Sequence, residues 1–243
     1  MEATTSTRST QDSIPLLSVR ALSKAYREGD RTLAVLTAID LSIAPGEQIA
    51  LIGRSGSGKS TLLNLLGGID RPDSGEIAIR GTAFSHLDER KRTLFRRRHI
   101  GFVYQSFNLI PTLSAVENVA LPLELNGTES GEAEAQAIAL LERIGIGRRA
   151  RAFPDRLSGG EQQRVAIARA LIHQPALVLA DELTGNLDVR TGRQVLDLLT
   201  ELFTDRGSGL LIVTHSLEVA RRADRVLTLD DGILKENAED LAW

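Results

Sequence analysis

The sequence reads GRSGSGKST at residues 53–61, which matches the phosphate-binding pattern G-x-x-x-x-G-K-[ST]. Polyphosphate is compact and highly charged, so a protein binds it through many short contacts. The glycines let the backbone turn and bring its N–H groups against phosphate oxygens, while Lys59 supplies a positive charge and Ser60 a hydroxyl that can ligate Mg²⁺. The stretch therefore predicts a nucleotide polyphosphate site.

The residues on either side of this loop agree with that prediction. QIALI at 48–52 is typical of a buried strand, and TLLNLLGG at 61–68 is apolar and helix-prone. A helix that begins at the loop turns the positive end of its dipole toward the phosphates. The alternative, a chance glycine-rich turn, does not account for this strand–loop–helix order.

Composition limits the possible classes of protein. The chain has 243 residues, of which 42% are hydrophobic and 25% charged, which suits one large α/β domain with room for a subdomain. A net charge of −3 implies no general affinity for nucleic acid, and the lack of cysteine excludes disulfides, thiolate zinc sites and a cysteine nucleophile. No apolar run approaches the roughly 18 residues that span a bilayer. Residues 1–13 have no apolar segment typical of a secretory signal, and we expect a disordered tail.

Strands alternate with helices along the chain, which predicts a mostly parallel sheet covered by helices. The predicted strands are 16–22, 38–43, 48–52, 75–81, 100–105, 177–180 and 210–214, with a final hairpin of 226–229 and 233–235. The predicted helices include 88–99, 132–144, 160–172 and 189–203. Residues from about 107 to 155 are interpreted as a helical insertion.

The segment 88–99, DERKRTLFRRRH, is strongly basic. A nucleic-acid patch would need more aromatic residues than the two present, and the chain as a whole is acidic. We therefore favour a solvated helix face, with proximity to anionic lipid headgroups as an alternative.

Three further motifs carry charged or small residues at places where ligands bind. LSGGE at 157–161 opens a helix with a serine and two glycines, so it is either a second anion site or an N-cap that eases a turn. LVLADE at 177–182 places Asp181 and Glu182 directly after a buried strand, at the carboxyl edge of the sheet. There Asp181 can orient the Mg²⁺ shell through water, and Glu182 can align the attacking water or accept its proton. His215 follows another strand to the same edge. Tyr26 is either a base-stacking aromatic or a half-buried core residue.

In order and spacing, these motifs resemble the ATP-binding subunits of ABC transporters over roughly residues 16–236. In this resemblance 53–61 is the Walker A motif, 157–161 the signature motif, 177–182 the Walker B strand with its catalytic glutamate, and 184–188 the D-loop. Gln105 matches the Q-loop glutamine, His215 the switch histidine and Tyr26 the adenine-stacking aromatic. The fold implied is a P-loop NTPase core with an antiparallel β subdomain and an inserted helical subdomain at about 107–155, the whole spanning 14–243.

The resemblance implies an ATPase that uses ATP and Mg²⁺. Two copies would pair head to tail, with each ATP between the Walker A of one and the signature motif of the other. Catalytic roles are implied for Lys59, Glu182 and His215, and metal contacts for Ser60, Gln105 and Asp181. The nucleotide contacts implied are Tyr26, Gly53, Arg54, Ser55, Gly56, Ser57, Gly58, Lys59, Ser60, Thr61, Gln105, Ser158, Gly159, Gly160 and Asp181. In DELTGNLD, Leu183 stands where the family usually has proline, so the loop loses a fixed φ angle and gains an N–H.

The run 101–125 and TGNLD resemble the branch of lipoprotein-release, macrolide-export and cell-division ATPases, including YbbA-type proteins. This implies a separate permease with few transmembrane helices and a large extracytoplasmic domain, and a place on the cytoplasmic face of the bacterial inner membrane. Export or extraction of lipid, lipoprotein or small hydrophobic cargo is one expectation, and mechanical gating of a partner that controls cell-wall or periplasmic factors is the alternative. No nucleic-acid partner is expected. The apolar residues Phe107, Leu109, Ile110 and Leu113 are either a docking groove for the permease or the helical subdomain's own core.

Overall fold

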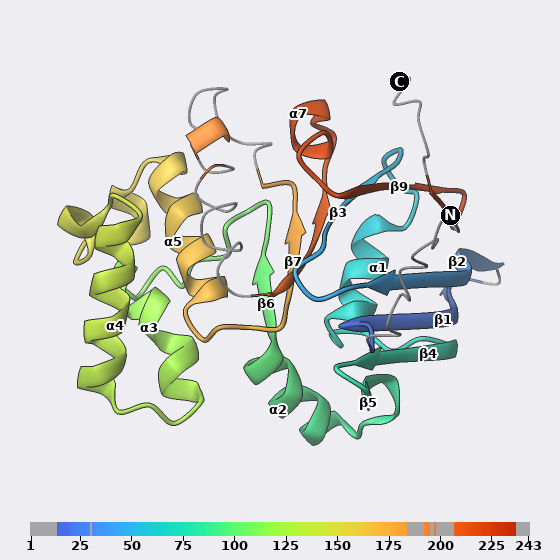
Figure 1. Cartoon of the computed structure of the whole chain (residues 1–243), viewed down its shortest axis with the longest axis horizontal. Coiled ribbons are helices and arrows are strands. Elements are labelled where there is room, and N and C mark those ends of the chain that lie inside the picture. Colours follow the sequence, from blue (N-terminus) through green and yellow to red (C-terminus); the bar gives the residue numbers. More distant parts are fainter. Residues whose placement is uncertain (1–13, 30, 184–191, 195–196, 198–206, 237–243) are drawn as a thin grey trace, which may run out of the picture.

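The computed structural model describes residues 14–29, 31–183, 192–194, 197 and 207–236. Two β-sheets and a group of helices form the molecule (Figure 1). The expected tail at 1–13 and D-loop at 184–188 lie outside the described residues, as does most of the predicted helix 189–203.

The larger sheet has six strands in the order β10-β9-β3-β8-β7-β6. All neighbouring pairs are parallel except the terminal hairpin of β9 and β10. Its strands are β3 (Gln48–Ile52), β6 (Ile100–Val103), β7 (Leu177–Asp181), β8 (Gly209–Val213), β9 (Arg225–Asp230) and β10 (Ile233–Glu236). The predicted mostly parallel sheet is confirmed, and its carboxyl edge gathers the ends of β3, β6, β7 and β8.

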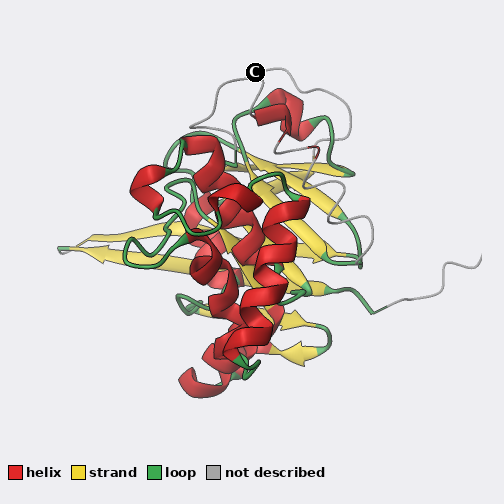
Figure 2. Cartoon of the chain, turned by 90° about the vertical axis from the view of Figure 1, so that its left-hand side faces the viewer, coloured by secondary structure: helices red, strands yellow, loops and turns green. Residues whose placement is uncertain are grey.

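The smaller sheet is antiparallel, in the order β2-β1-β4-β5, with strands β1 (Leu17–Glu28), β2 (Arg31–Ile43), β4 (Ser74–Ile79) and β5 (Thr82–Ala83). The sequence prediction placed Tyr26 between two short strands, and this was wrong: Tyr26 lies inside β1, opposite Leu33 of β2. The outer part of this hairpin is polar and lacks an apolar pattern, so only the pairing of the two strands reveals it. The hairpin extends away from the helices (Figure 2).

Three helices pack together at one end of the molecule (Figure 1). They are α3 (Ala115–Leu125), α4 (Ser130–Arg143) and α5 (Gly159–Leu171). The other helices whose bounds lie within the described residues are α1 (Lys59–Leu66), α2 (Glu89–His99) and α7 (Leu217–Ala220), with short 3-10 turns at Phe84–His86, Gly147–Arg149 and Pro154–Arg156. The helices predicted at 88–99, 132–144 and 160–172 are confirmed to within two residues at each end. Among the described helices none has the length and apolar character needed to cross a bilayer.

The two largest apolar cores of the described residues lie on opposite faces of the parallel sheet. In β7, Val178 and Ala180 join the core formed by α3, α4 and α5, whereas Leu177 and Leu179 join the core shared with α1 and the antiparallel sheet. Because alternate side chains of a strand point to opposite faces, one short strand serves both cores. The carboxyl end of β7 is thereby fixed from both sides.

The apolar residues at 107–113 are half-buried. Phe107 and Leu109 pack against the core of the helical group, which favours the interpretation as core for these two side chains. Ile110 and Leu113 are also only partly covered.

Candidate functional site

The loop after β3 has the conformation that close approach to phosphate requires. Gly53, Gly56 and Gly58 have φ angles of 152°, 79° and 101°. A Cβ at Gly53 would lie 2.2 Å from Leu229 O, and one at Gly58 would lie 2.9 Å from Val35 O. These two positions therefore require glycine both for the backbone angle and for space. Helix α1 begins directly after Gly58, and no side chain caps its first turn. Its N–H groups are the type of donor that binds an anion at a helix N-terminus.

Lys59 is buried and its ammonium group is held inside this loop. Its Nζ donates hydrogen bonds of 2.7 Å to Gly53 O and 2.7 Å to Arg54 O. Burial lowers the pKa of Lys59, while the nearby carboxylates of Glu182 and Asp181 act in the opposite direction. A desolvated cation beside the N-terminus of a helix is suited to a polyanion.

A cavity of about 420 Å³ opens in front of the loop. It collects predicted residues from the ends of β3, β6, β7 and β8 and from β1. Its lining is Tyr26, Val35, Ser55, Gly56, Gly58, Lys59, Ser60, Thr61, Gln105, Asp181, Glu182, Val213 and His215. Val35 was not predicted, because it belongs to the part of β2 that the sequence pattern did not reveal. Gly53, Arg54 and Ser57 lie in the loop but do not line the cavity.

The residues predicted to hold Mg²⁺ meet in this cavity. Ser60 Oγ donates to Asp181 Oδ2 at 3.4 Å, and Gln105 lines the same space. Among the described residues, no group of three or more histidine, aspartate or glutamate side chains could hold a metal ion by itself. Mg²⁺ prefers one or two protein oxygens together with waters and substrate phosphates, so this donor set fits Mg²⁺ bound with a nucleotide. The ion would neutralise charge that develops on the phosphates.

Glu182 and His215 lie beside each other at the ends of β7 and β8. Glu182 N donates to Val213 O at 3.0 Å, and the side chain is 13% exposed. Its Oε1 lies 3.6 Å from His215 Nε2. Burial raises the pKa of Glu182, and the nearby His215 lowers it. A carboxyl with a raised pKa in a cavity is suited to accept a proton near neutral pH.

Tyr26 lies at the rim of the cavity with 41% of its surface exposed. Its hydroxyl donates to Asp70 Oδ2 at 2.8 Å, and Lys24 Nζ lies 5.0 Å from the ring centroid. Lys24 also pairs with Asp70 at 3.0 Å. Tyr26 is therefore partly exposed at the rim and belongs to neither large apolar core. Sequence reasoning missed the two side chains that hold it, since no motif marks Lys24 or Asp70.

The signature segment lies away from this cavity, at the start of α5. Ser158 Oγ accepts from Glu161 N at 3.3 Å, and Glu161 Oε2 accepts from Ser158 N at 2.8 Å, so the two residues form a capping box. Ser158 and Gly159 are exposed, and Gly160 is partly exposed. The N-cap interpretation of this serine is thus confirmed, while none of the three residues lines the cavity of its own chain.

Leu183, the departure from the family pattern, is buried with 1% exposure in the core of the helical group. Its side chain therefore contributes packing at the point where the usual proline would fix the backbone. The D-loop residues that follow it lie outside the described residues.

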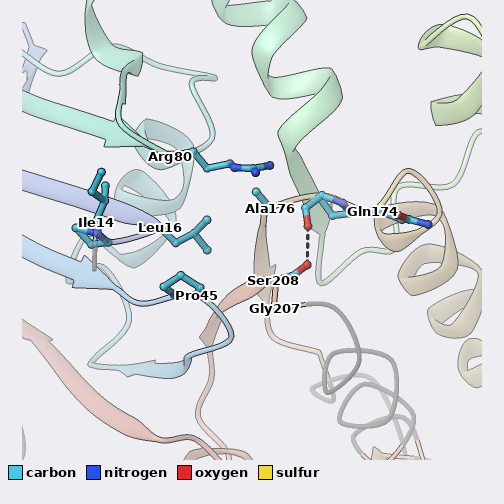
Figure 3. Close-up of a pocket in the computed structure, with 10 residues that line it drawn as sticks. Ile14, Leu16, Pro45, Arg80, Gln174, Ala176, Gly207 and Ser208 are labelled. Carbon is cyan, nitrogen blue, oxygen red and sulfur yellow. Dashed lines mark hydrogen bonds between the residues drawn. The ribbon is translucent and has the colours of Figure 1, made fainter. Parts of the chain in front are cut away.

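A larger hollow of about 570 Å³ lies elsewhere, near the amino ends of β7 and β8 (Figure 3). Arg80, Gln174 and Ser208 are among its lining, and Ser208 Oγ donates to Pro175 O at 2.6 Å. None of the predicted site residues lines it. The chemistry of the lining, and not the volume, therefore selects the smaller cavity as the candidate site.

Residues 36–185 match the family model described as ABC transporter. The chain belongs to the ABC transporter family. It is 51% identical to the lipoprotein-releasing system ATP-binding protein LolD of Pseudomonas syringae pv. tomato, over 91% of this chain and 97% of LolD. It is 49% identical to the uncharacterised ABC transporter ATP-binding protein YbbA of Escherichia coli, over 92% of this chain and 98% of YbbA.

The fold agrees with that of a solved ATP-binding cassette. The structure of MJ0796 in a dimeric, post-hydrolysis state bound to ADP and Pi matches with a TM-score of 0.86 and 40% identity, over 93% of this chain and 99% of that chain. The predicted fold class, family, ATPase activity and use of ATP with Mg²⁺ are thereby confirmed. The chain is an ATP-binding and ATP-hydrolysing subunit of the ABC transporter family.

Proposed function

We propose that the 420 Å³ cavity binds Mg·ATP and hydrolyses it with the groups that line it. Lys59 and the loop N–H groups hold the β- and γ-phosphates, while Ser60 and Asp181 orient Mg²⁺. Glu182 aligns the attacking water and accepts its proton. The observation that carries this proposal is that Ser60 of α1 meets Asp181 and Glu182, at the end of β7, at one edge of the sheet.

The remaining predicted residues complete the proposal. Tyr26 stacks on adenine, Gln105 contacts the metal shell and His215 contacts the γ-phosphate. Ser158, Gly159 and Gly160 contact the ATP of a second copy in a head-to-tail dimer. Their exposure away from their own cavity supports this, as does the dimeric state of MJ0796, which is 40% identical to this chain.

We further propose that the subunit energises export or extraction of lipid, lipoprotein or small hydrophobic cargo from the cytoplasmic face of a bacterial inner membrane. The likeness to LolD, the ATP-binding protein of a lipoprotein-releasing system, supports lipoprotein as the cargo. The separate permease would have few membrane helices and a large extracytoplasmic domain. The partly covered Ile110 and Leu113, next to Phe107 and Leu109, offer the apolar surface for its cytoplasmic segment.

A pull-down from membranes tests the proposed partner. The tagged chain is expressed at its natural level, isolated with mild detergent, and the co-purified chains are identified by mass spectrometry. We expect a permease with about four membrane helices and a large extracytoplasmic domain. Recovery of a many-helix importer permease would overturn the proposed branch.

The same experiment separates transport from mechanical gating. Co-recovery of a cell-wall hydrolase or its activator, in place of lipid or lipoprotein, would replace the export proposal with the gating alternative. Glu182→Gln is the matched control, because it keeps the docking surface but lacks hydrolysis. A partner recovered equally with both chains binds independently of ATP hydrolysis.

A further inference from the structure

The segment that follows Gln105 is held by a side chain from α5. Arg169 donates two hydrogen bonds to successive backbone carbonyls, from Nη1 to Asn108 O at 2.7 Å and from Nη2 to Phe107 O at 2.9 Å. A planar guanidinium with two parallel donors matches two neighbouring acceptors in a way that an ammonium cannot. Arg169 therefore fixes the position of the backbone two residues after Gln105.

The backbone at these two carbonyls adopts a conformation that side chains disfavour. Phe107 and Asn108 have φ angles of 60° and 47°. Two consecutive left-handed residues other than glycine persist only where surrounding contacts impose them. The hydrogen bonds from Arg169 supply one such contact.

The far end of the same segment is fixed from α3. Asn118, which is fully buried, accepts from Ile110 N at 2.8 Å and donates to Ile110 O, Leu113 O and Ser114 O. Residues 107–113 are thus anchored to two helices, and the anchor nearer to Gln105 is the one on α5.

Helix α5 joins Arg169 to the signature motif. Ser158 caps its N-terminus, and the helix axis rises about 16 Å from residue 158 to residue 169, at 1.5 Å per residue. Val165, Ala166 and Ala168 are fully buried in the helical core, so the helix between Ser158 and Arg169 is held by close packing. A displacement at Ser158 would therefore reach the carbonyls after Gln105.

We propose that Arg169 is a positioning residue that couples the signature motif to Gln105, and thereby one ATP site of the dimer to the other. This rests on the proposed function, in which Ser158 contacts the ATP of the partner copy and Gln105 contacts the metal shell in its own cavity. In this proposal, contact of Ser158 with the ATP of the partner copy determines the position of α5. Arg169 then determines the position of the backbone after Gln105, and so of the metal contact.

The test replaces Arg169 by methionine, which retains the length of the side chain and removes both donors. Arg164→Met is the matched control, because Arg164 lies on the same helix and also binds a backbone carbonyl, Ile144 O at 3.0 Å, away from the segment 107–113. We measure kcat, KM for ATP, the Hill coefficient, the Mg²⁺ concentration at half-maximal rate and the thermal midpoint, for the full chain and with its permease.

For Arg169→Met we expect kcat to fall about tenfold, as for loss of a charged hydrogen-bonding group. We also expect the Hill coefficient to fall from above 1 in the native chain to near 1, and the Mg²⁺ requirement to rise. KM for ATP should change less than about threefold. Arg164→Met should change kcat and the Mg²⁺ requirement less than about twofold. Arg169→Lys, which keeps the charge but places its donors on a single nitrogen, should restore part of kcat and part of the cooperativity.

Equal effects of the two methionine variants, or a fall in thermal midpoint without a change in cooperativity or Mg²⁺ requirement, would overturn the proposal. If Arg169→Met does not fold, Arg169→Lys decides: unchanged cooperativity and Mg²⁺ requirement in that variant reject the coupling. Gln105→Ala, measured in parallel, separates the two levels of the argument. If Gln105→Ala leaves the Mg²⁺ requirement unchanged, the proposed role of Gln105 fails. If Gln105→Ala raises the Mg²⁺ requirement but Arg169→Met changes neither this requirement nor the cooperativity, only the coupling is rejected.

Discussion

His215 Nε2 lies 3.6 Å from Glu182 Oε1, and the two residues come from the ends of neighbouring parallel strands, β8 and β7. Burial raises the pKa of the Glu182 carboxyl and His215 opposes this rise. The pair therefore sets the pH range in which the proposed base is deprotonated.

The exchange His215→Ala should shift the acidic limb of the pH profile of kcat/KM to higher pH. A general base works deprotonated, so a higher pKa of Glu182 requires a higher pH for activity, and loss of His215 removes a contribution that lowers this pKa. The measurement is kcat/KM for ATP across pH, since this ratio reports the free enzyme. An acidic limb that stays in place, or moves to lower pH, would contradict the proposed electrostatic relation.

Glu182→Gln should lower the rate of hydrolysis by about 10²-fold or more and leave nucleotide binding intact. The amide keeps the shape of the side chain but cannot accept the proton. At saturating Mg·ATP this variant should form a stable dimer, detected by size-exclusion chromatography with light scattering. A variant that stays monomeric would count against the head-to-tail arrangement, and the same variant with ADP is the control.

Lys59→Ala should weaken ATP binding about 10- to 100-fold, the range for losing a charged hydrogen bond to phosphate. Lys91→Ala is a suitable control, because Lys91 is exposed on α2 and pairs with Asp88 at 3.2 Å. Isothermal titration with Mg·ATP measures both. Equal affinity of the Lys59 variant and the native chain would reject the phosphate-binding role of the loop.

Tyr26→Ala should cost about 1 to 3 kcal/mol of ATP binding, the range for stacking of one base on an aromatic ring, with little effect on kcat. Tyr26→Phe keeps the ring and loses the hydroxyl that hydrogen-bonds to Asp70, so its loss of ATP affinity should be smaller. Fluorescence titration and thermal unfolding check both variants. Because Tyr26 is 41% exposed, a large loss of stability in the alanine variant would contradict its proposed place at the rim.

Gly53→Ala should destabilise the fold by at least about 3 kcal/mol, since the new Cβ would lie 2.2 Å from Leu229 O in a left-handed backbone. In Gly56→Ala the new Cβ has no atom within 4 Å, so only the φ angle of 79° is unfavourable, and the loss of stability should be about 1 kcal/mol. Urea unfolding of the two variants compares these costs. Similar midpoints would show that the backbone angle, and not the contact with β9, determines the loop.

Most helices and the parallel strands could be predicted because their apolar spacing is local. The outer part of the β1–β2 hairpin could not, since SKAYRE and RTLAV have no alternating pattern and exist as strands only through their pairing. For the same reason Val35 was missed at the cavity, together with Lys24 and Asp70 around Tyr26.

The sequence by itself determined the chemistry of this ATPase: the glycine loop, Lys59, the acidic pair after β7 and the signature serine are each read from short local patterns whose residue types the reaction requires. The tertiary structure decided which of these groups share one cavity. It brings Gln105, Asp181 and His215 to Ser60 and leaves Ser158 outside. It also links Arg169 to the segment after Gln105, more than 60 positions earlier. Such contacts depend on the order of strands in the sheet and on the packing of α5, which no local pattern encodes.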